Sequence, residues 1–366
     1  MIAERMNRID ASGIRKVFDL AAKMDNPVNL SIGQPEFDVP DPVKAAAHQA
    51  IDDGFNKYTL TQGIPELRSK ISSSLADQGR LKGHEQYDVM VSSGTSGGLF
   101  LAMFALVNPG DEVLFADPYF VMYKHFVNLL DGVPVFVDTY PDFCLSAERV
   151  EPYITPKTKL LIVNSPANPT GQVFSDSSLK DLADLCNRHG IFVITDEIYS
   201  AFSYDAPHTS IFPYVSNGLL LDGFSKSHAM TGWRVGYAAG PAELIQNMNK
   251  LQQYTFVCSP SMAQKAAVVA LDHDMSDTIA AYKRKRDIIY NGLKDRFDLV
   301  KPGGAFYAFP AAPGGNASAF VQKAIANNLL VIPGNVFSEK DSHFRISFAA
   351  DDSVLEQGIA ILNSLA

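Results

Sequence analysis

The chain has 366 residues, of which 46% are hydrophobic, and its formal net charge is −9 at pH 7. This length and hydrophobic fraction suffice for a large buried core, arranged as two domains or as one large α/β unit with an appendage. The acidic balance and the lack of a long basic run argue against nucleic acid and anionic membranes as partners.

Cysteine usage and hydropathy indicate the compartment. The three cysteines are widely spaced and odd in number, which predicts neither a disulfide framework nor a metal site. The N-terminal residues lack the apolar core of a signal peptide, and no apolar run approaches the roughly 20 residues that span a bilayer. We therefore expect a cytoplasmic protein with no membrane partner.

Short apolar runs alternate with helical patterns through the middle of the chain. The apolar runs predict seven strands, at residues 88–92, 112–116, 133–137, 159–164, 191–195, 219–221 and 235–239. Several are apolar almost throughout, as expected for strands covered on both faces. Helical patterns between them include residues 96–107 and 176–189. This alternation predicts a mostly parallel sheet with right-handed crossovers.

The pattern changes from about residue 275. A charged helical stretch at 279–297 precedes short predicted strands around one further helix at 317–327. Residues 31–35 resemble a strand that enters a loop, and we expect them to pack with this C-terminal part. The predicted fold class is α/β: a large domain at 41–285 with a mostly parallel seven-stranded sheet covered by helices, and a smaller α+β domain from residues 1–40 and 286–366.

Small and hydroxyl-bearing residues follow the first predicted strand. Gly94, Thr95 and Ser96 lie in the sequence Ser-Ser-Gly-Thr-Ser-Gly-Gly, just before an apolar helix. Small residues let a phosphate approach the backbone amides at a helix N-terminus, where the helix dipole also favours an anion. An ordinary glycine- and serine-rich helix start is the alternative.

Polar side chains also follow two later strands. Asn168 lies in the turn Asn-Ser-Pro-Ala-Asn-Pro-Thr-Gly, where the following proline restricts its backbone. Asp196 ends a buried strand, where an unpaired charge is costly and a protonated pyridine nitrogen would be a suitable partner. Tyr199 comes from the same turn. Taken singly, an ordinary turn is the alternative for Asn168, and a helix-capping carboxylate is the alternative for Asp196.

Lys226 lies in the sequence Gly-Phe-Ser-Lys-Ser-His-Ala-Met-Thr-Gly-Trp-Arg, eight residues before Arg234. Partial desolvation and a nearby cation lower the pKa of a lysine, and an unprotonated amine forms an imine with an aldehyde. A solvated surface lysine is the alternative. A lysine for an aldehyde, an arginine for a phosphate and a carboxylate for a ring nitrogen together predict a pyridoxal phosphate site.

Two further residues fit such a site. Arg345 lies in the apolar sequence His-Phe-Arg-Ile-Ser-Phe, and a planar carboxylate is its natural partner. An internal salt bridge with a core acid is the alternative. Phe120, or its neighbour Tyr119, follows another strand and is able to stack on a flat ring, although packing in the core is the usual role of an aromatic residue.

In this order and spacing, the motifs resemble those of the class I and II aminotransferases, which are fold-type I pyridoxal phosphate enzymes. The resemblance covers nearly the whole chain and is greatest with the aspartate and aromatic amino-acid branch. It includes Asn-Pro-Thr-Gly at 168–171, Asp-Glu-Ile-Tyr at 196–199, Ser-Lys at 225–226 and Phe-Arg-Ile-Ser at 344–347.

The resemblance implies catalytic roles for three residues. Lys226 would bind pyridoxal 5'-phosphate covalently and move the substrate proton. Asp196 would pair with the ring nitrogen of the cofactor, and Tyr199 would bind its phenolic oxygen together with Asn168. Phe120 would stack on the ring.

The resemblance also implies binding roles. The cofactor phosphate would be held by Gly94, Thr95, Ser96, Ser225 and Arg234. The α-carboxylate of the substrate would be bound by Arg345, helped by Asn168 and by the backbone of Gly33. In a homodimer, Tyr58 would reach across the interface to the phosphate in the partner subunit.

Two activities fit this site: a transaminase that moves an amino group from an L-amino acid to a 2-oxo acid, with 2-oxoglutarate as the expected acceptor, and a carbon–sulfur β-lyase. A cofactor-binding regulator is disfavoured because such regulators usually carry a DNA-binding domain ahead of this fold. A dehydrogenase is disfavoured because no Rossmann glycine pattern follows a strand. A dicarboxylate substrate would need a second cation, for which Arg15 is a candidate, although a solvated helix charge is its alternative.

Overall fold

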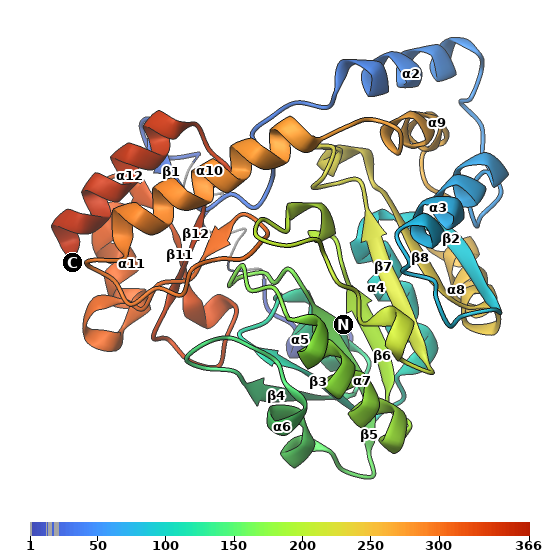
Figure 1. Cartoon of the computed structure of the whole chain (residues 1–366), viewed down its shortest axis with the longest axis horizontal. Helices are drawn as coiled ribbons and strands as arrows, with labels where there is room; N and C mark the ends of the chain where they lie inside the picture. Colours follow the sequence, from blue (N-terminus) through green and yellow to red (C-terminus); the bar gives the residue numbers. More distant parts are fainter. Residues whose placement is uncertain (1, 12, 14–16, 18–21) are drawn as a thin grey trace.

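The computed structural model describes residues 2–11, 13, 17 and 22–366 (Figure 1). Arg15 lies outside the described residues. Among the helices described, none is long and apolar enough to cross a membrane.

A seven-stranded sheet forms the centre of the larger part of the molecule. Its strand order is β2-β8-β7-β6-β5-β3-β4, and β8 runs antiparallel to both of its neighbours. The other pairs within β7-β6-β5-β3-β4 are parallel. The prediction of seven strands in a mostly parallel sheet is confirmed by β2 (Tyr87–Ser93), β3 (Glu112–Asp117), β4 (Val133–Asp138), β5 (Thr158–Asn164), β6 (Phe192–Asp196), β7 (Gly218–Gly223) and β8 (Val235–Pro241).

Helices cover both faces of this sheet. One face packs against α4 (Gly94–Leu106), α5 (Met122–Leu129) and α8 (Ala242–Tyr254). The other packs against α3 (Pro65–Asp77), α6 (Ala147–Val150), α7 (Asp176–His189) and α9 (Ser261–Ala270). Along β5, Leu160 and Ile162 belong to the first cluster, whereas Leu161 and Val163 belong to the second. Because alternate residues of a strand point to opposite faces, a strand covered on both sides is apolar throughout.

Local sequence sets the ends of the helices. The helices predicted at 96–107 and 176–189 correspond to α4 and α7. The side chain of Ser175 accepts a hydrogen bond from the backbone N–H of Ser178 at the start of α7. Gly190 ends the same helix with a φ of 66°, a left-handed conformation that glycine adopts without strain.

The C-terminal part is built on short strands and three helices, shown in orange and red in Figure 1. The antiparallel strands are β11 (Ile332–Pro333), β12 (Phe344–Ser347) and β9 (Tyr307–Ala308). The long helix α10 (Ser276–Leu293) packs beside α12 (Asp352–Leu365), and α11 (Ala317–Ala326) lies next to β10 (Leu329–Leu330). The helices predicted at 279–297 and 317–327 are therefore present, although the first ends four residues earlier.

The N-terminal strand begins three residues before its predicted position. β1 (Val28–Asn29) pairs in parallel with β10, so this segment does pack with the C-terminal part. Residues 31–35 are not a strand, which corrects the prediction. The backbone N–H and the hydroxyl of Ser31 both donate to Oδ1 of Asn29, so a local turn replaces the pairing of a strand.

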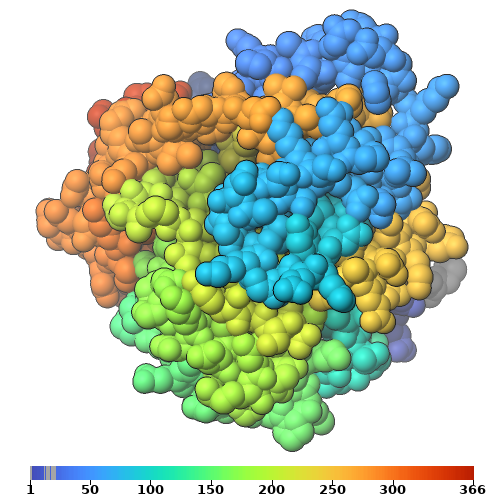
Figure 2. Space-filling view, turned by 45° about the vertical axis from the view of Figure 1, so that its right-hand side comes forward, coloured from blue at the N-terminus to red at the C-terminus, as the bar shows by residue number. Residues whose placement is uncertain are grey.

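Two helices from the first part of the chain cover one side of the molecule. α2 (Asp41–Asp52) packs on α9, and Figure 2 shows α2 and α3, in blue, spread over this face. α10 crosses residue 285, at which we placed the boundary between the two domains. The division into 41–285 and into 1–40 with 286–366 stays a prediction.

The central strands should contribute much more to stability than the edge of the sheet. Val193 on β6 is 1% exposed, whereas Val133 at the start of β4 is 44% exposed. We expect Val193→Ala to lower the free energy of unfolding by about 2–3 kcal/mol, because it removes two buried methyl groups and leaves a cavity. The matched control Val133→Ala should change it by less than about 0.5 kcal/mol. Urea titrations of the two variants measure this difference, and equal values would contradict the burial described here.

Candidate active site

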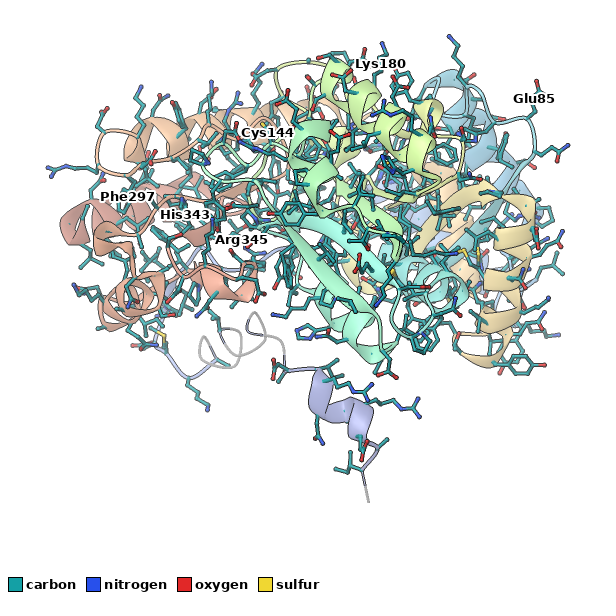
Figure 3. The ribbon with its side chains drawn as sticks, turned by 90° about the horizontal axis from the view of Figure 1, so that it is seen from below. Glu85, Cys144, Lys180, Phe297, His343 and Arg345 are labelled. Carbon is teal, nitrogen blue, oxygen red and sulfur yellow. The ribbon has the colours of Figure 1, made fainter. Side chains whose placement is uncertain are left out.

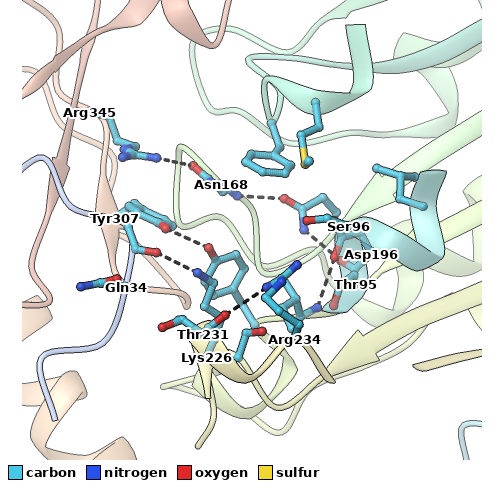
Figure 4. A pocket seen from close by; sticks show the side chains of 18 residues that line it. Gln34, Thr95, Ser96, Asn168, Asp196, Lys226, Thr231, Arg234, Tyr307 and Arg345 are labelled. Atoms are coloured by element: carbon cyan, nitrogen blue, oxygen red, sulfur yellow. Dashed lines mark hydrogen bonds between the residues drawn. The ribbon is translucent and has the colours of Figure 1, made fainter. Parts of the chain in front are cut away.

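Most of the predicted site residues line one pocket of about 280 Å³ at the carboxyl edge of the large sheet. Residues at or after the ends of β5, β6 and β7 line it, and so does Arg345, which Figure 3 shows on the C-terminal part at the side of the large sheet. The predicted residues that line the pocket are Gly33, Thr95, Ser96, Phe120, Asn168, Asp196, Tyr199, Ser225, Lys226, Arg234 and Arg345 (Figure 4). Ligands commonly bind at this edge of open α/β sheets.

One end of the pocket is formed by the N-terminus of α4 and by Arg234. Gly94 starts the helix with a φ of 64°, and a β-carbon at this position would lie 2.6 Å from Nη2 of Arg234. The guanidinium donates to the backbone carbonyls of Thr231 and Ser93, at 3.0 and 3.1 Å. Oγ1 of Thr95 is buried and has no partner among the described residues. Free helix amides, an unpartnered hydroxyl and a guanidinium together form a binding site for an anion such as phosphate.

Asp196 ends β6 with its carboxylate inside the pocket, and the residue is 5% exposed. The hydroxyl of Tyr123 donates to its Oδ2 at 2.8 Å, and the backbone N–H of Ile198 donates to its Oδ1 at 3.4 Å. Burial raises the pKa of Asp196 to about 6. A buried carboxylate of this kind is stabilised when a cationic ligand group binds beside it.

Lys226 lies on the loop between β7 and β8, and its Nζ donates to the backbone carbonyl of Gly33 at 2.8 Å. Burial, followed by the positive charges of Arg345 and Arg234, lowers the pKa of Lys226 to about 8. About half of the amine is therefore unprotonated at pH 8, whereas an ordinary lysine is almost fully charged there. An unprotonated amine is the nucleophilic form that reacts with an aldehyde.

Arg345 is a fully buried cation that has no carboxylate partner among the described residues. Its guanidinium lies between the rings of Tyr307 and Phe337, with its carbon 4.5 Å from each ring centroid. Nη1 donates to Oδ1 of Asn168 at 3.1 Å, and Nη2 donates to the carbonyl of Ser31 at 2.8 Å. Within the described part of the chain, the alternative of an internal salt bridge is therefore wrong. The guanidinium is held rigidly and has no counter-ion in the part of the chain that the structure describes, and a ligand carboxylate would supply one.

Asn168 is positioned by a second asparagine. Its backbone N–H donates to Oδ1 of Asn164 at 2.9 Å, and Nδ2 of Asn164 donates to the backbone carbonyl of Asp196 at 2.9 Å. The side-chain oxygen of Asn168 is used by Arg345, so its amide N–H₂ is the group that remains for a ligand. These contacts join the turn after β5 to the end of β6 and place Asn168 between Asp196 and Arg345 (Figure 4).

Three further residues, to which the sequence analysis gives no role, contribute hydrogen bonds to the site. Tyr123 binds Asp196, the hydroxyl of Tyr307 lies 2.8 Å from that of Tyr199, and Asn164 orients Asn168. Tyr123 lies within the helix α5 and does not directly follow a predicted strand, so the sequence carries no clear signal for it. Asn164 does end a predicted strand, which was an available signal.

Two predicted residues do not line the pocket. Gly94 directly precedes Thr95 and shapes the helix start, but the pocket surface begins one residue later. Tyr58 lies outside the pocket and is 84% exposed. Within a single chain, the structure therefore gives Tyr58 no contact with the site.

Comparison with known proteins places this geometry in a family. Residues 25–362 match the family model of aminotransferase class I and II. A probable aspartate aminotransferase of Methanocaldococcus jannaschii is 38% identical over 100% of both chains. Aromatic-amino-acid aminotransferase 2 of Thermococcus litoralis is 33% identical, over 98% of this chain and 96% of that protein. The solved aspartate aminotransferase of Thermus thermophilus with maleate is 32% identical, with a TM-score of 0.95 and 100% of both chains covered. The chain belongs to the class I and II aminotransferases.

Membership makes pyridoxal phosphate the cofactor and transamination the reaction. The pocket fits this cofactor. The anion site at α4 suits its phosphate, the buried carboxylate of Asp196 suits its ring nitrogen, and the amine of Lys226 suits its aldehyde. Nothing in these relatives favours the carbon–sulfur lyase alternative.

The hydrogen bond from Tyr123 should support cofactor binding through Asp196. We expect Tyr123→Phe to weaken the affinity of the apoenzyme for pyridoxal phosphate by about tenfold or more, because hydrogen bonds to charged groups contribute about 1.5–3 kcal/mol. Fluorescence titration of the apoenzyme measures the affinity. Tyr119→Phe is the matched control. The hydroxyl of Tyr119 donates to Oε1 of Glu339 at a distance of 2.8 Å, and neither residue lines the pocket. Equal affinities of the two variants would show that Tyr123 does not act on the cofactor.

Proposed function

We propose that the protein transfers the amino group of an L-amino acid to a 2-oxo acid, with 2-oxoglutarate as the acceptor, in a ping-pong cycle. The observation that carries this proposal is Arg345, a buried guanidinium that shares a pocket with Lys226 and has no carboxylate partner within residues 2–11, 13, 17 and 22–366. Both the amino acid and the oxo acid bear an α-carboxylate. A single cation beside a reactive amine therefore serves both halves of the cycle.

Lys226 acts first as a nucleophile and then as a base. Unprotonated Nζ would hold the cofactor through its aldehyde, and the same nitrogen, when free, would take up the proton of the substrate Cα and hold it for return. The carbonyl of Gly33, which accepts the hydrogen bond of Nζ, orients the amine on the side of the pocket where Arg345 lies.

Asp196 would support this proton transfer through the ring nitrogen of the cofactor. When bound, pyridoxal phosphate supplies an aldehyde for the amino group and an electron-poor ring that draws electrons from the substrate Cα. The carboxylate of Asp196 keeps the ring nitrogen protonated, because a buried anion favours a bound proton beside it.

The remaining residues hold the cofactor and the substrate in place. Tyr199 and the amide of Asn168 bind the phenolic oxygen, and Phe120 stacks on the ring. The phosphate is bound by Gly94, Thr95, Ser96, Ser225 and Arg234. The α-carboxylate is bound by Arg345, with Asn168 and the backbone of Gly33 beside it. The motivating observation is that all of these residues except Gly94 line one pocket, and that Gly94 directly precedes the lining residue Thr95 at the N-terminus of α4.

A half-reaction tests the proposal. Holoenzyme that receives an amino donor alone should convert its bound cofactor to the amine form, seen by absorbance, and release one equivalent of oxo acid. A panel of aspartate, phenylalanine and tyrosine then ranks the donors. Release of ammonia and pyruvate from a cysteine conjugate, without any oxo-acid acceptor, would instead identify a lyase.

The pKa of Lys226 predicts how cofactor uptake depends on pH. Because burial and two arginines lower that pKa to about 8, covalent uptake of pyridoxal phosphate by the apoenzyme should accelerate as the pH rises through about 8, and then level off. Stopped-flow absorbance measures this rate. Lys226→Ala should bind the cofactor without the covalent phase and should have no measurable transaminase activity. A midpoint near 10.5, the value of an ordinary lysine, would contradict a desolvated amine.

We further propose a homodimer. Exposed aromatic and aliphatic side chains gather on two neighbouring segments, at Phe55, Tyr58, Leu60, Tyr254, Phe256 and Val257. Nε2 of Gln264 donates to Thr59 at 3.0 Å and Nε2 of Gln252 donates to the carbonyl of Thr61, so the first segment is fixed and presents Tyr58 outwards. Phe256 packs edge-on against Phe100 of α4, next to the phosphate end of the pocket. A second copy bound here would receive Tyr58 near its phosphate site.

A pair of tyrosines on this surface tests the dimer. Tyr58→Phe should leave a dimer by analytical ultracentrifugation but weaken pyridoxal phosphate binding by about tenfold or more, since it removes a charge-assisted hydrogen bond. Tyr254→Phe, on the same surface and equally exposed, should leave the affinity unchanged. A monomer at micromolar concentration would exclude the dimer.

A cytoplasmic location also stays a proposal. It is supported by the free state of Cys144, Cys186 and Cys258, since unpaired cysteines are typical of a reducing compartment.

A further inference from the structure

Behind the pocket lies a buried cluster of charges that none of the roles above uses. We propose that Arg80 is a positioning residue of the active site: its guanidinium joins the strand end that carries Asp196 to the strand end that leads to Lys226, and it balances the negative charge behind both. This inference rests on the proposed roles of Asp196 and Lys226.

One nitrogen of Arg80 bonds two carboxylates on neighbouring strands. Nη2 lies 2.5 Å from Oε2 of Glu197 and 2.9 Å from Oδ2 of Asp222. Arg80 is 6% exposed, Glu197 is 1% exposed and Asp222 is 5% exposed. Glu197 directly follows Asp196 at the end of β6, and Asp222 is the penultimate residue of the strand β7, four residues before Lys226. The guanidinium therefore spans the two strands at the point where each delivers its functional residue.

The rest of the cluster makes this bridge rigid. Glu197 also accepts hydrogen bonds from the hydroxyls of Thr195 and Ser210 and contacts Nε2 of His208 at 2.9 Å. Asp222 also accepts from the hydroxyl of Ser200 at 3.1 Å and from the backbone N–H of Gly223. Each carboxylate therefore keeps other hydrogen-bond donors if Arg80 is removed. What is lost is the connection between Glu197 and Asp222.

Arg80 is itself held by the end of α3. Its backbone N–H donates to the carbonyl of Leu75 at 2.9 Å, and Nη1 contacts Oε1 of Gln78 at 3.2 Å. α3 contributes no lining residue to the catalytic pocket. The contact thus transmits the position of a peripheral helix to the carboxyl edge of the sheet.

The charge of Arg80 matters because three carboxylates, those of Asp196, Glu197 and Asp222, are buried at the ends of the neighbouring strands β6 and β7. Burial, and also the charges of Asp222 and Glu197, raise the pKa of Asp196. Burial alone would raise the pKa of Glu197, but the charges of Arg80 and then of His208 outweigh it and lower this pKa to about 2. For Asp222, burial outweighs the charge of Arg80 and raises the pKa. Tyr237 on β8 also faces this cluster. With Arg80 in place the group carries one net negative charge fewer than without it.

The experiment replaces Arg80 while keeping its charge, removing its charge, or removing the charge together with that of Glu197. The variants are Arg80→Lys, Arg80→Gln, Glu197→Gln and Arg80→Gln/Glu197→Gln. Arg286→Gln is the matched control, because Arg286 is also fully buried and paired with an aspartate, Asp205, but does not line the catalytic pocket. Two properties are measured. The first is the affinity of each apoenzyme for pyridoxal phosphate. The second is the pH midpoint of each holoenzyme, which is the pH at which the absorbance of the bound cofactor has made half of its pH-dependent change.

We expect Arg80→Gln to raise the pH midpoint of the holoenzyme by about half a unit or more. The reason is that uncompensated negative charge nearby stabilises the protonated, more positive form of the group that titrates in the pocket. Its affinity for pyridoxal phosphate should fall about tenfold, because the two strand ends are no longer joined. Arg80→Lys should stay near the wild type in both properties, since one ammonium is able to replace one Nη2. The double variant restores the net charge, so its pH midpoint should return close to that of the wild type.

If Arg80→Gln does not accumulate as folded protein, Glu197→Gln and the double variant provide the same comparison: removing Arg80 from the Glu197→Gln protein should raise the midpoint. Midpoints and affinities that change no more than in Arg286→Gln would overturn the inference and leave Arg80 a purely structural residue. Failure of the proposed function is distinct, because wild-type protein would then show no covalent cofactor absorbance at all.

Discussion

The active site depends on burying Asp196, Lys226 and Arg345 in one pocket without pairing them with each other. A buried charge without a counter-ion is unstable on its own, so each of these groups favours a ligand group of a particular kind. The carboxylate favours a cation, the guanidinium favours a carboxylate, and the desolvated amine favours loss of its proton. In the proposed roles, the pyridinium ring, the α-carboxylate and the aldehyde would meet these demands together, so one electrostatic principle would govern the binding of both cofactor and substrates.

The fold makes this burial possible by bringing parallel strands to a common edge. β5, β6 and β7 each present polar groups of the site at or shortly after their carboxyl ends, and helices on both faces exclude water from the sheet below. The C-terminal part closes the pocket from the other side with Arg345 and Tyr307. Gly33 and Ser31 come from the N-terminal segment that pairs with β10, so both ends of the chain meet the middle at the substrate side of the cofactor.

Much of this arrangement could be predicted because the signals were local. Strands buried on both faces are continuous apolar runs, and polar residues directly after them stand out, as Asp196 and Asn168 do. The position of β1 could not be predicted in the same way, since the pattern of residues 31–35 is satisfied equally by a strand and by the turn that Ser31 forms with Asn29. Tyr123 also gave no signal, because its importance comes from the direction of one hydroxyl on a helix.

The amino-acid sequence by itself determined the alternation of strands and helices, the residue types of the cofactor site and their placement at strand ends, because periodicity and turn chemistry act over a few neighbouring residues. The tertiary structure alone decided which charges lack partners. Arg345 pairs with no acid among the residues that the structure describes, whereas Arg80 joins two carboxylates that lie 117 and 142 residues further along the chain. Electrostatic pairing depends on distance in space and on exclusion of water, and neither is encoded in the spacing of residues along the chain.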